Sequence, residues 1–479
     1  MLLLKTCHSC LTLLKPLIIV CRKGNNQVDV KPFLRTEGDI NLSNERREWQ
    51  ENHLSQQTLD VLEEDSRYFL HQSMSTPCLN VITDAEGIYL EDMDGRKIID
   101  FHGNSVHQVG HKNRYVIDAM KNQLDELPFL PRRYTSPIAV KLAKKLVDLA
   151  PGDLNRVLFT PGGTSAVGLA MKLARKATGK FKTISTWDSF HGAGLDAISV
   201  GGEGVFRNQI GPLLPGAEHM MPYNSYRGLF SGSEDSGMKS LEYLAYMLEM
   251  ENDIGAIIME PIRSTDVQIP PKAYFQRIRQ LCDQYGVLLI LDEIPGAFGR
   301  TGKMFVHEHY DIVPDIVVIG KGFGGGVFPM AGIIAREGLN VAQDISLGHY
   351  THEKSSVGCA AALATIEFIE NHNLLAHAEQ MGVFMEQRLK EMMDRHEIVG
   401  DVRVKGMLAG VELVTNRQTK EKAVEGAEKV MYRCLEKGLS FKVSNGNVIT
   451  LVPPLIATQG EVEQALSILE EAIGDVFTN

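Results

Sequence analysis

The sequence predicts an α/β protein, with a large domain built on a mostly parallel sheet flanked by helices and a smaller α+β domain built from both chain ends. Two observations predict this arrangement. From about residue 137, continuous apolar runs alternate with amphipathic helical segments, which is typical of parallel strands covered on both faces. The chain of 479 residues is also too long for one small domain, so two or three packed units are expected.

We expect four regions along the chain. Residues 1–26 form an apolar leader that Lys5 and Lys15 interrupt, so no run approaches the ~20 residues of a membrane span. No clear cleavage site follows, and we interpret this segment as a disordered leader or an overlong start of a cytoplasmic protein. Residues 27–105 are expected to form an N-terminal arm and part of the small domain, residues 106–372 the large domain, and residues 373–479 the C-terminal small domain.

The first elements are predicted from periodicity and turn chemistry. Residues 43–73 carry apolar positions at helical spacing and predict a helix. Three short apolar runs at residues 81–82, 88–90 and 97–99 are separated by turns that contain Asp and Gly. This pattern predicts a β-meander.

The following segments alternate between helix and strand. We expect helices over residues 138–149, 166–177, 274–285 and 358 to about 371, and strands over residues 156–159, 256–259, 287–291 and 316–319, with a further extended segment at 327–334. Beyond residue 371 we expect more helices and two strands, at 408–412 and 448–452.

Composition excludes some functions. The formal net charge is -11 and there is no Lys/Arg-rich block, which argues against nucleic-acid binding. Cys7 and Cys10 form one CxxC pair, but no second ligand pair has matching spacing, so no metal site is expected. The 44 glycines indicate many tight turns or close backbone approaches to a ligand.

Two charged residues directly follow buried strands. Asp292 ends the run Leu288–Leu291, and Lys321 follows Ile316–Ile319 after one glycine. Ligands of open α/β sheets bind at the carboxyl ends of the strands. Alone, such a lysine is more often a solvated loop residue, and such an aspartate a helix cap. Together they suit a pyridoxal-phosphate (PLP) site, in which a lysine binds the cofactor and a carboxylate keeps its ring nitrogen protonated.

The text around this pair resembles the class III aminotransferase signature. The resemblance lies in Tyr274-x8-DQYGVLLILDE-x5-GRTG, ending at Gly302, and in DIVVIGKGFGGG, from Asp315 to Gly326, and it extends over residues 80–470. Gly320-x-Gly322-x-x-Gly325 also matches a dinucleotide fingerprint. That motif must open a helix, whereas residues 327–334 are expected to be extended.

The resemblance implies the PLP fold type I, PLP as cofactor, no nucleic-acid or membrane partner, and a homodimer with shared active sites. Lys321 and Asp292 are the implied catalytic residues. The other implied cofactor contacts are Gly163 and Thr164 at the phosphate, Phe190 and His191 at the ring, Glu260 behind it, Ile294, which precedes the position where Pro295 replaces the family's Gln, and Thr351, which reaches the cofactor of the neighbouring subunit.

Two departures from the family pattern bear on the substrate. Family members that use 2-oxoglutarate have an arginine at the position of Thr450, which holds the α-carboxylate in a bidentate pair. The glutamate that gates this arginine is replaced by Thr265. Either the α-carboxylate site has been lost, or Arg263 or another arginine has replaced it.

Further polar residues are candidates for substrate contacts. Asn104 and His107 lie in a segment where the family has small and apolar residues. Arg132 and Arg133 lie in a loop that borders the substrate pocket in the family, and paired guanidinium groups suit a phosphonate or phosphate. The alternative for each is an ordinary surface residue.

These departures resemble the amine-lyase branch of the class. We expect a lyase that eliminates ammonia from a small β-hydroxy amine, with (R)-1-hydroxy-2-aminoethylphosphonate as substrate and phosphonoacetaldehyde as product. The main alternative is an ω-aminotransferase that passes an amino group from an amine to a 2-oxo acid. A catalytically silent PLP-binding homologue is disfavoured because Lys321 and Asp292 are both present.

Overall fold

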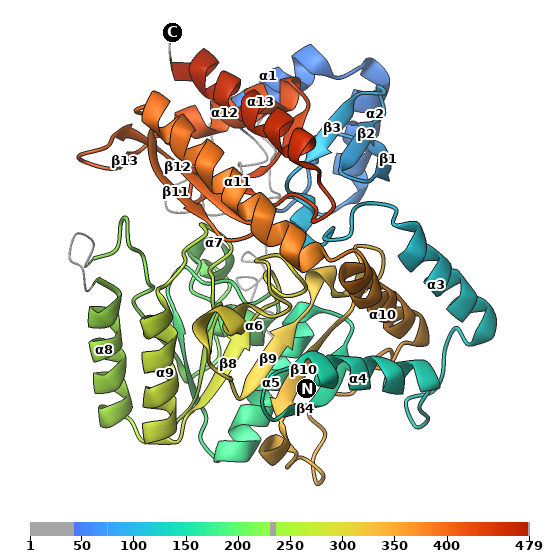
Figure 1. The fold of residues 1–479 in the computed structure, drawn as a ribbon, viewed down its shortest axis with the longest axis vertical. Helices are drawn as coiled ribbons and strands as arrows, with labels where there is room; N and C mark the ends of the chain where they lie inside the picture. The colour runs from blue at the N-terminus through green and yellow to red at the C-terminus, as the bar shows by residue number, and fades with distance from the viewer. Residues whose placement is uncertain (1–42, 74, 230–235, 478–479) are drawn as a thin grey trace, which may run out of the picture. The chain divides into compact units, whose positions relative to one another are not determined.

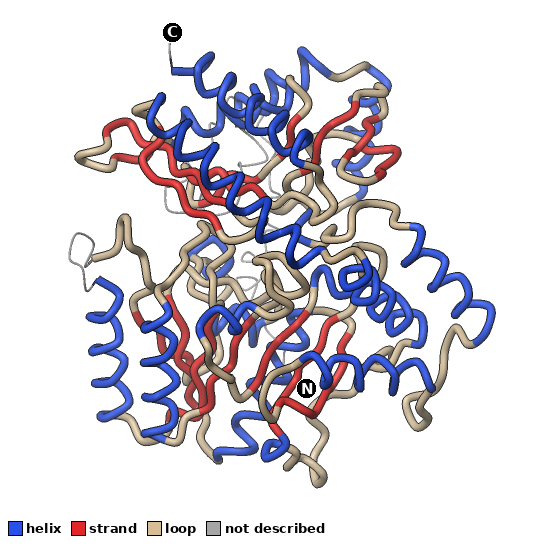
Figure 2. Tube along the Cα trace, viewed as in Figure 1, coloured by secondary structure: helices blue, strands red, loops and turns tan. Residues whose placement is uncertain are grey.

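The computed structural model describes residues 43–73, 75–229 and 236–477. The prediction for residues 1–26 lies outside these ranges. Within them, three sheets organise the chain: one of seven strands, one of five and one of four. Figure 1 shows the elements by label, and Figure 2 separates helices from strands by colour.

The seven-stranded sheet has the order β4-β10-β9-β8-β7-β5-β6, and all neighbours are parallel except β10, which is antiparallel to β4 and β9. The prediction of a mostly parallel sheet is therefore confirmed. The bounds are β4 (Leu154–Thr160), β5 (Lys182–Thr186), β6 (Ala217–Met220), β7 (Ile254–Met259), β8 (Leu288–Asp292), β9 (Ile316–Ile319) and β10 (Ala331–Arg336).

Helices cover both faces of this sheet because its central strands are apolar on both sides. Ile258 and Ile290 pack with α5, whereas Ile257 and Leu289 pack with α8 and α9. α8 and α9 lie side by side (Figure 1). The helices of this part are α3 (Arg114–Glu126), α4 (Pro137–Leu149), α5 (Gly163–Thr178), α6 (Leu195–Val200), α7 (Gly204–Arg207), α8 (Ser236–Met250), α9 (Lys272–Tyr285) and α10 (Ser356–Asn371).

The four-stranded sheet combines segments from both ends of the described chain, and the five-stranded sheet is built from its C-terminal part alone. β3 pairs in parallel with β14, which joins the N-terminal meander to a strand near the C-terminus. The four-stranded sheet contains β1 (Ile82–Glu86), β2 (Tyr89–Asp92), β3 (Lys97–Asp100) and β14 (Leu439–Ser440), and the five-stranded sheet contains β11 (Val399–Val404), β12 (Ala409–Asn416), β13 (Glu421–Lys422), β15 (Lys442–Ser444) and β16 (Val448–Leu451). Helices α11 (Leu374–Arg395), α12 (Val424–Glu436) and α13 (Gln459–Phe477) accompany them. The predicted α+β region from both chain ends is confirmed.

The single helix predicted over residues 43–73 is wrong in detail. The structure has α1 (Asn44–His53) and α2 (Gln56–Tyr68), which are separated at Leu54 and Ser55. The Ser55 hydroxyl accepts a hydrogen bond from the Thr58 N–H, so Ser55 caps a second helix. A capping serine inside an apolar periodic segment thus starts a new helix.

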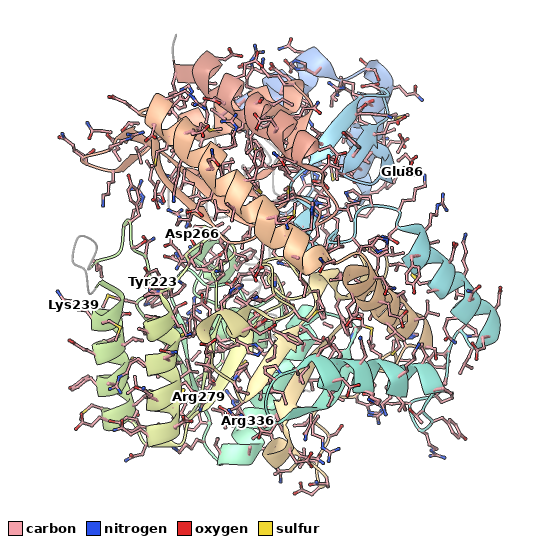
Figure 3. All side chains as sticks on the ribbon, viewed as in Figure 1. Glu86, Tyr223, Lys239, Asp266, Arg279 and Arg336 are labelled. Carbon is pink, nitrogen blue, oxygen red and sulfur yellow. The ribbon has the colours of Figure 1, made fainter. Side chains whose placement is uncertain are left out.

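An ion-pair cluster stabilises the amino-terminal ends of the central parallel strands, opposite the carboxyl ends of these strands. Asp315, just before β9, accepts hydrogen bonds from the Leu289 N–H at 2.7 Å and from Arg279 at 2.6 Å, and Arg336 lies 3.3 Å away. Arg279 and Arg336 are labelled in Figure 3.

Among the described residues, no helix is long and apolar enough to cross a membrane.

Candidate active site

A cavity of about 380 Å³ lies at the carboxyl ends of the parallel strands. Asp292 ends β8 and Lys321 follows β9, so adjacent parallel strands deliver both to one edge. The cavity is lined by His102, Asn104, Ser105, Gly163, Thr164, Phe190, His191, Gly192, Ala193, Ser264, Thr265, Asp292, Ile294, Pro295, Lys321, Lys442, Thr450 and Val452. Most of the predicted cofactor residues are therefore neighbours.

Asp292 is held in a buried hydrogen-bond network. It is 2% exposed, and the Nδ1 of His191 lies 2.8 Å from its Oδ2. Its Oδ1 accepts the Ile294 N–H at 3.1 Å. A buried carboxylate fixed by two such contacts presents its negative charge in one direction.

Lys321 lies on a tight turn between β9 and the rest of the chain. Its φ is 47°, which is rare for a residue with a side chain and is typical of functional sites that hold backbone strain. A Cβ on the next residue, Gly322, would lie 1.8 Å from the amide oxygen of Gln108, so a larger residue there would require the Gln108 side chain to move. The turn that carries Lys321 is thus closely packed against the Gln108 side chain.

The N-terminus of α5 forms one wall of the cavity. Gly163 and Thr164 are its first residues, and their backbone N–H groups have no partner within the helix, as at every helix N-terminus. The Thr164 hydroxyl accepts the Ala193 N–H at 3.0 Å, and a Cβ on Gly192 would lie 2.4 Å from that hydroxyl. This small-residue cradle suits a phosphate.

Glu260 lies behind the cavity and does not line it. Its carboxylate accepts the N–H and the hydroxyl of Ser264, each at 3.0 Å, and the Phe190 N–H at 3.5 Å. Burial raises the pKa of Glu260, although nearby His191 opposes this. Glu260 therefore fixes two segments that line the cavity.

The two threonines that replace the family's arginine and glutamate meet at the cavity. The Thr450 hydroxyl donates to the Thr265 carbonyl at 3.1 Å, and the Thr265 hydroxyl donates to Glu203 at 2.9 Å. Arg263 does not line the cavity: it is buried and donates two hydrogen bonds to Asp266, at 2.7 and 2.6 Å. The alternative in which Arg263 takes over the substrate carboxylate thus conflicts with its existing pair.

Asp266 also links the two main sheets. Its carbonyl accepts hydrogen bonds from Arg403 of β11 at 3.2 and 2.9 Å. Figure 3 labels Asp266 where β11 approaches the segment that follows β7. This bond ties the Thr265 segment to the five-stranded sheet that carries Thr450.

The segment after β3 contributes a polar wall. His102, Asn104 and Ser105 line the cavity, and Asn104 and Ser105 have φ of 47° and 58°. Asp100 accepts the backbone N–H groups of His102 and Gly103, each at 2.9 Å. The Asp100 carboxylate therefore fixes the backbone conformation of this polar wall.

His107 lies beneath this wall and does not line the cavity. Its Nε2 donates to the Asp100 carbonyl at 3.0 Å, and burial lowers the pKa of His107 to about 4, against the opposing charge of Asp100. The Nε2 of His111 lies 2.8 Å from the Asp100 carboxylate. Burial alone would raise the pKa of Asp100, but its hydrogen bond with His111 and the charge of His107 hold it well below its usual range.

These three side chains could also be viewed as metal ligands, since their ligand atoms lie within 4.8 Å of one another. The nitrogen of His107 closest to Asp100 already donates a hydrogen to a carbonyl. The hydrogen bonds therefore explain the cluster without an ion.

Arg132, Arg133 and Thr351 do not line the cavity of this chain. Arg132 and Thr351 border a separate small hollow, where Arg132 lies 3.8 Å from Glu353 and donates to the Gly348 carbonyl at 3.4 Å. Arg133 is exposed. Arg132 and Arg133 were predicted to border the substrate pocket, and the structure does not place them at this cavity. Thr351 was predicted to reach the cofactor of the neighbouring subunit, and that stays a prediction.

Three polar residues of the cavity were not predicted from the sequence: Ser264, Lys442 and Ser105. His102, which also lines the cavity, belongs to the histidine-rich segment after β3 that was predicted to contact the substrate. Lys442 lies on β15, directly opposite Thr450 of β16. Lys442 could not be predicted from the sequence, because its strand has only three residues and such a short segment shows no recognisable periodicity.

The residues of the cavity fit PLP. The Nε2 of His191 is buried without a hydrogen-bond partner among the described residues, and the ring lines the cavity. A helix N-terminus for an anion, a buried carboxylate and a lysine surround the same space. This set combines a phosphate cradle, a partner for a protonated ring nitrogen and an amine that can bind an aldehyde.

Comparisons with known proteins agree with this site. The family described as Aminotransferase class-III matches residues 70–473. The chain is 50% identical over 457 residues to (R)-1-hydroxy-2-aminoethylphosphonate ammonia-lyase of Vibrio splendidus (strain 12B01), covering 92% of this chain and 95% of that protein. It is 34% identical over 427 residues to leucine/methionine racemase of Thermococcus litoralis, covering 87% and 96%.

Solved structures show the same architecture. The taurine:2-oxoglutarate aminotransferase of Bifidobacterium kashiwanohense, solved in complex with PLP and glutamate, has a TM-score of 0.83 and 30% identity, covering 88% of this chain and 98% of that one. An ω-transaminase of Pseudomonas jessenii in complex with PMP has a TM-score of 0.83 and 28% identity, covering 87% and 98%. The PLP-bound neighbours agree with the fit of the cavity.

Proposed function

Because this chain belongs to the class III aminotransferase family and its cofactor is pyridoxal 5'-phosphate, we propose that it is an ammonia-lyase. The proposed substrate is (R)-1-hydroxy-2-aminoethylphosphonate, and the products are phosphonoacetaldehyde and ammonia. The observation that carries this proposal is the threonine pair at the cavity. Thr450 and Thr265 stand where a 2-oxo acid would need a guanidinium and its gate, and none of the described residues that line the cavity is an arginine.

A lyase suits this arrangement because it needs no second substrate. A 2-oxo acid acceptor depends on a bidentate arginine, and a charge-assisted pair of that kind contributes roughly 1.5–3 kcal/mol per hydrogen bond. The threonine hydroxyls also have partners, since Thr450 donates to Thr265 and Thr265 donates to Glu203. The 50% identity to the Vibrio enzyme supports the same conclusion.

Each residue has a defined task in this proposal. Bound PLP supplies an electron sink for the carbon that carries the amine. Lys321 would bind the cofactor aldehyde when no substrate is present, and its free Nζ would accept the proton from that carbon once the substrate amine has replaced it, while Asp292 would keep the ring nitrogen protonated. Gly163 and Thr164 would bind the phosphate, and Glu260 would position Phe190 at the ring.

The overall reaction balances without an oxidant or acceptor. The proton leaves the amine-bearing carbon, the β-hydroxyl departs as water, and one water then hydrolyses the remaining enamine. The amine-bearing carbon becomes the aldehyde of phosphonoacetaldehyde, and nitrogen leaves as ammonia. The reaction would belong to phosphonate catabolism.

We further propose that the enzyme works as a homodimer with shared sites. Thr351 and Arg132 lie together in a hollow outside the cavity, which supports a role for Thr351, Arg132 and neighbouring Arg133 at the site of the other subunit. Asn104 is proposed to contact the substrate directly, and His107 to stabilise the polar wall that carries Asn104.

A cytoplasmic location stays a prediction.

The decisive experiment is a stoichiometric assay with every 2-oxo acid removed. We expect ammonia and phosphonoacetaldehyde in equal amounts over many turnovers. If no β-hydroxy amine yields ammonia, but pyruvate or 2-oxoglutarate accepts the amino group, the ω-aminotransferase alternative replaces the lyase.

A further inference from the structure

The proposed substrate carries a phosphonate that needs a cation inside or beside the cavity. Only two carbon atoms separate its amine from its phosphorus atom, so the phosphonate must stay close to the lysine that processes the amine. Among the described residues that line the cavity, two are lysines, Lys321 and Lys442. Lys321 serves the cofactor and the proton transfer, which leaves Lys442 as the cavity lysine without an assigned role.

Lys442 reaches the cavity because of its register in the five-stranded sheet. β15 and β16 are antiparallel, with Lys442 opposite Thr450 and Val443 opposite Ile449. Val443 and Ile449 are 4% and 0% exposed and belong to the main hydrophobic core. Since alternate residues of a strand point to opposite faces, Lys442 and Thr450 share the face that borders the cavity.

Thr450 makes space for a ligand at this corner. An arginine at this position would extend a long guanidinium side chain in front of Lys442, whereas threonine is short and bonds back to the Thr265 carbonyl. The sheet thus presents a cation from the strand next to the one where an α-carboxylate arginine would stand. Lys442 therefore suits a substrate whose anionic group is at a different position from the α-carboxylate that such an arginine binds.

We propose that Lys442 binds the distal phosphonate of the substrate and thereby selects β-hydroxy amines that carry a doubly charged anion. This inference rests on the proposed function. An ammonium group is a compact charge with three donors, which suits the oxygens of a tetrahedral anion. Because Lys442 is half-buried at the cavity, its attraction is screened less than that of a surface lysine.

The first test compares Lys442→Gln with wild type in the PLP-loaded enzyme. We expect the KM for 1-hydroxy-2-aminoethylphosphonate to rise about 10- to 100-fold, the range for losing a charge-assisted hydrogen bond, with a smaller change in kcat. The KM for 1-amino-2-propanol, a β-hydroxy amine without the phosphonate, should stay within about twofold. Lys442→Arg should recover part of the loss, and Lys429→Gln, which changes an exposed lysine of α12, is the matched control.

Two further measurements are independent of turnover. Phosphonoacetate, titrated calorimetrically into wild type and Lys442→Gln, should bind the variant about 10- to 100-fold more weakly. In wild type, phosphonoacetate should protect Lys442 but not Lys429 from acetylation, as mapped by mass spectrometry. This footprint keeps the test valid if Lys442→Gln fails to fold.

The outcomes separate this inference from the proposed function. Unchanged KM and phosphonoacetate affinity in Lys442→Gln, or acetylation of Lys442 that phosphonoacetate does not slow, would overturn the role of Lys442. A loss confined to Arg132→Gln or Arg133→Gln would overturn it equally and assign the anion to that loop. If wild type releases no ammonia, the lyase proposal fails, while the phosphonoacetate measurements still decide whether Lys442 binds the anion.

Discussion

Replacing Asp292 by asparagine tests how the cavity activates its cofactor. The side chain is almost isosteric, but its single oxygen can accept only one of the two hydrogen bonds that the carboxylate accepts, from the His191 Nδ1–H at 2.8 Å and from the Ile294 N–H. The negative charge is also lost, and the new amide group donates a hydrogen to the ring nitrogen instead of accepting one. The ring nitrogen then stays unprotonated and withdraws electrons poorly.

The expected loss can be estimated from the burial of this carboxylate. Two unit charges about 4 Å apart attract each other by about 4 kcal/mol at an effective dielectric constant of about 20. Because about 1.4 kcal/mol corresponds to tenfold in rate, kcat should fall about 1000-fold if this attraction is lost from the transition state. The phosphate cradle at Gly163 and Thr164 is untouched, so cofactor affinity should change much less.

The assay measures kcat for ammonia release together with bound PLP and melting temperature. Asp283→Asn, which changes an exposed aspartate of α9, is the control for the same substitution elsewhere in the domain. The reasoning is refuted if Asp292→Asn keeps kcat within tenfold of wild type while it binds PLP normally. Loss of PLP binding with unchanged folding would instead move the main role of Asp292 to cofactor retention.

Three further predictions concern the cofactor, its cradle and acid stability. Lys321→Ala should lose the adduct that borohydride fixes covalently in wild type, and a variant that still gives a reducible protein adduct would exclude this lysine. A Cβ on Gly163 would lie 2.8 Å from the Ile294 Cδ1, so Gly163→Ala should weaken PLP binding to the apoenzyme about tenfold, and Ile294→Val should relieve much of that loss; equal affinities in all three proteins would contradict the close contact. The pKa of His107 is lowered from 6.5 to about 4, so the unfolded state binds the extra proton between these values and stability should be complete above about pH 6.5 and fall toward pH 4. Melting temperatures measured from pH 4.5 to 7.5 should fall with falling pH in wild type, and less steeply in His107→Gln. Part of the pH dependence should remain in the variant, because burial lowers the pKa of His309 in the same way. An unchanged pH dependence in His107→Gln would show that His107 is not its source.

Local pattern was enough to predict the catalytic edge of the large sheet. Asp292 and Lys321 each follow a short apolar run, and parallel strands of this kind place their carboxyl ends at one edge. The helix after β4 was also predicted, with its start at residue 166, whereas in the structure it begins at Gly163, so that the small residues predicted as a loop form its first turn. The family signature then assigned roles that strand and helix periodicity do not contain.

Other features depended on contacts between distant segments. Lys442 lies in a strand of three residues, and only its pairing with β16 places it beside Thr450 and at the cavity. His107 is placed beneath the polar wall by Asp100, whose charge and carbonyl it contacts. In both cases the sequence supplies the residue type, whereas register and long-range hydrogen bonds decide which face it occupies.

The sequence by itself thus determined the alternation of strands and helices and the charged residues at the strand ends, since these follow from neighbouring side chains. Only the tertiary structure placed Arg132 outside the cavity, beside Thr351, and Lys442 at the cavity. The physical reason is that a one-residue shift in strand pairing moves a side chain to the opposite face, and such pairing is set by packing between segments far apart in the chain.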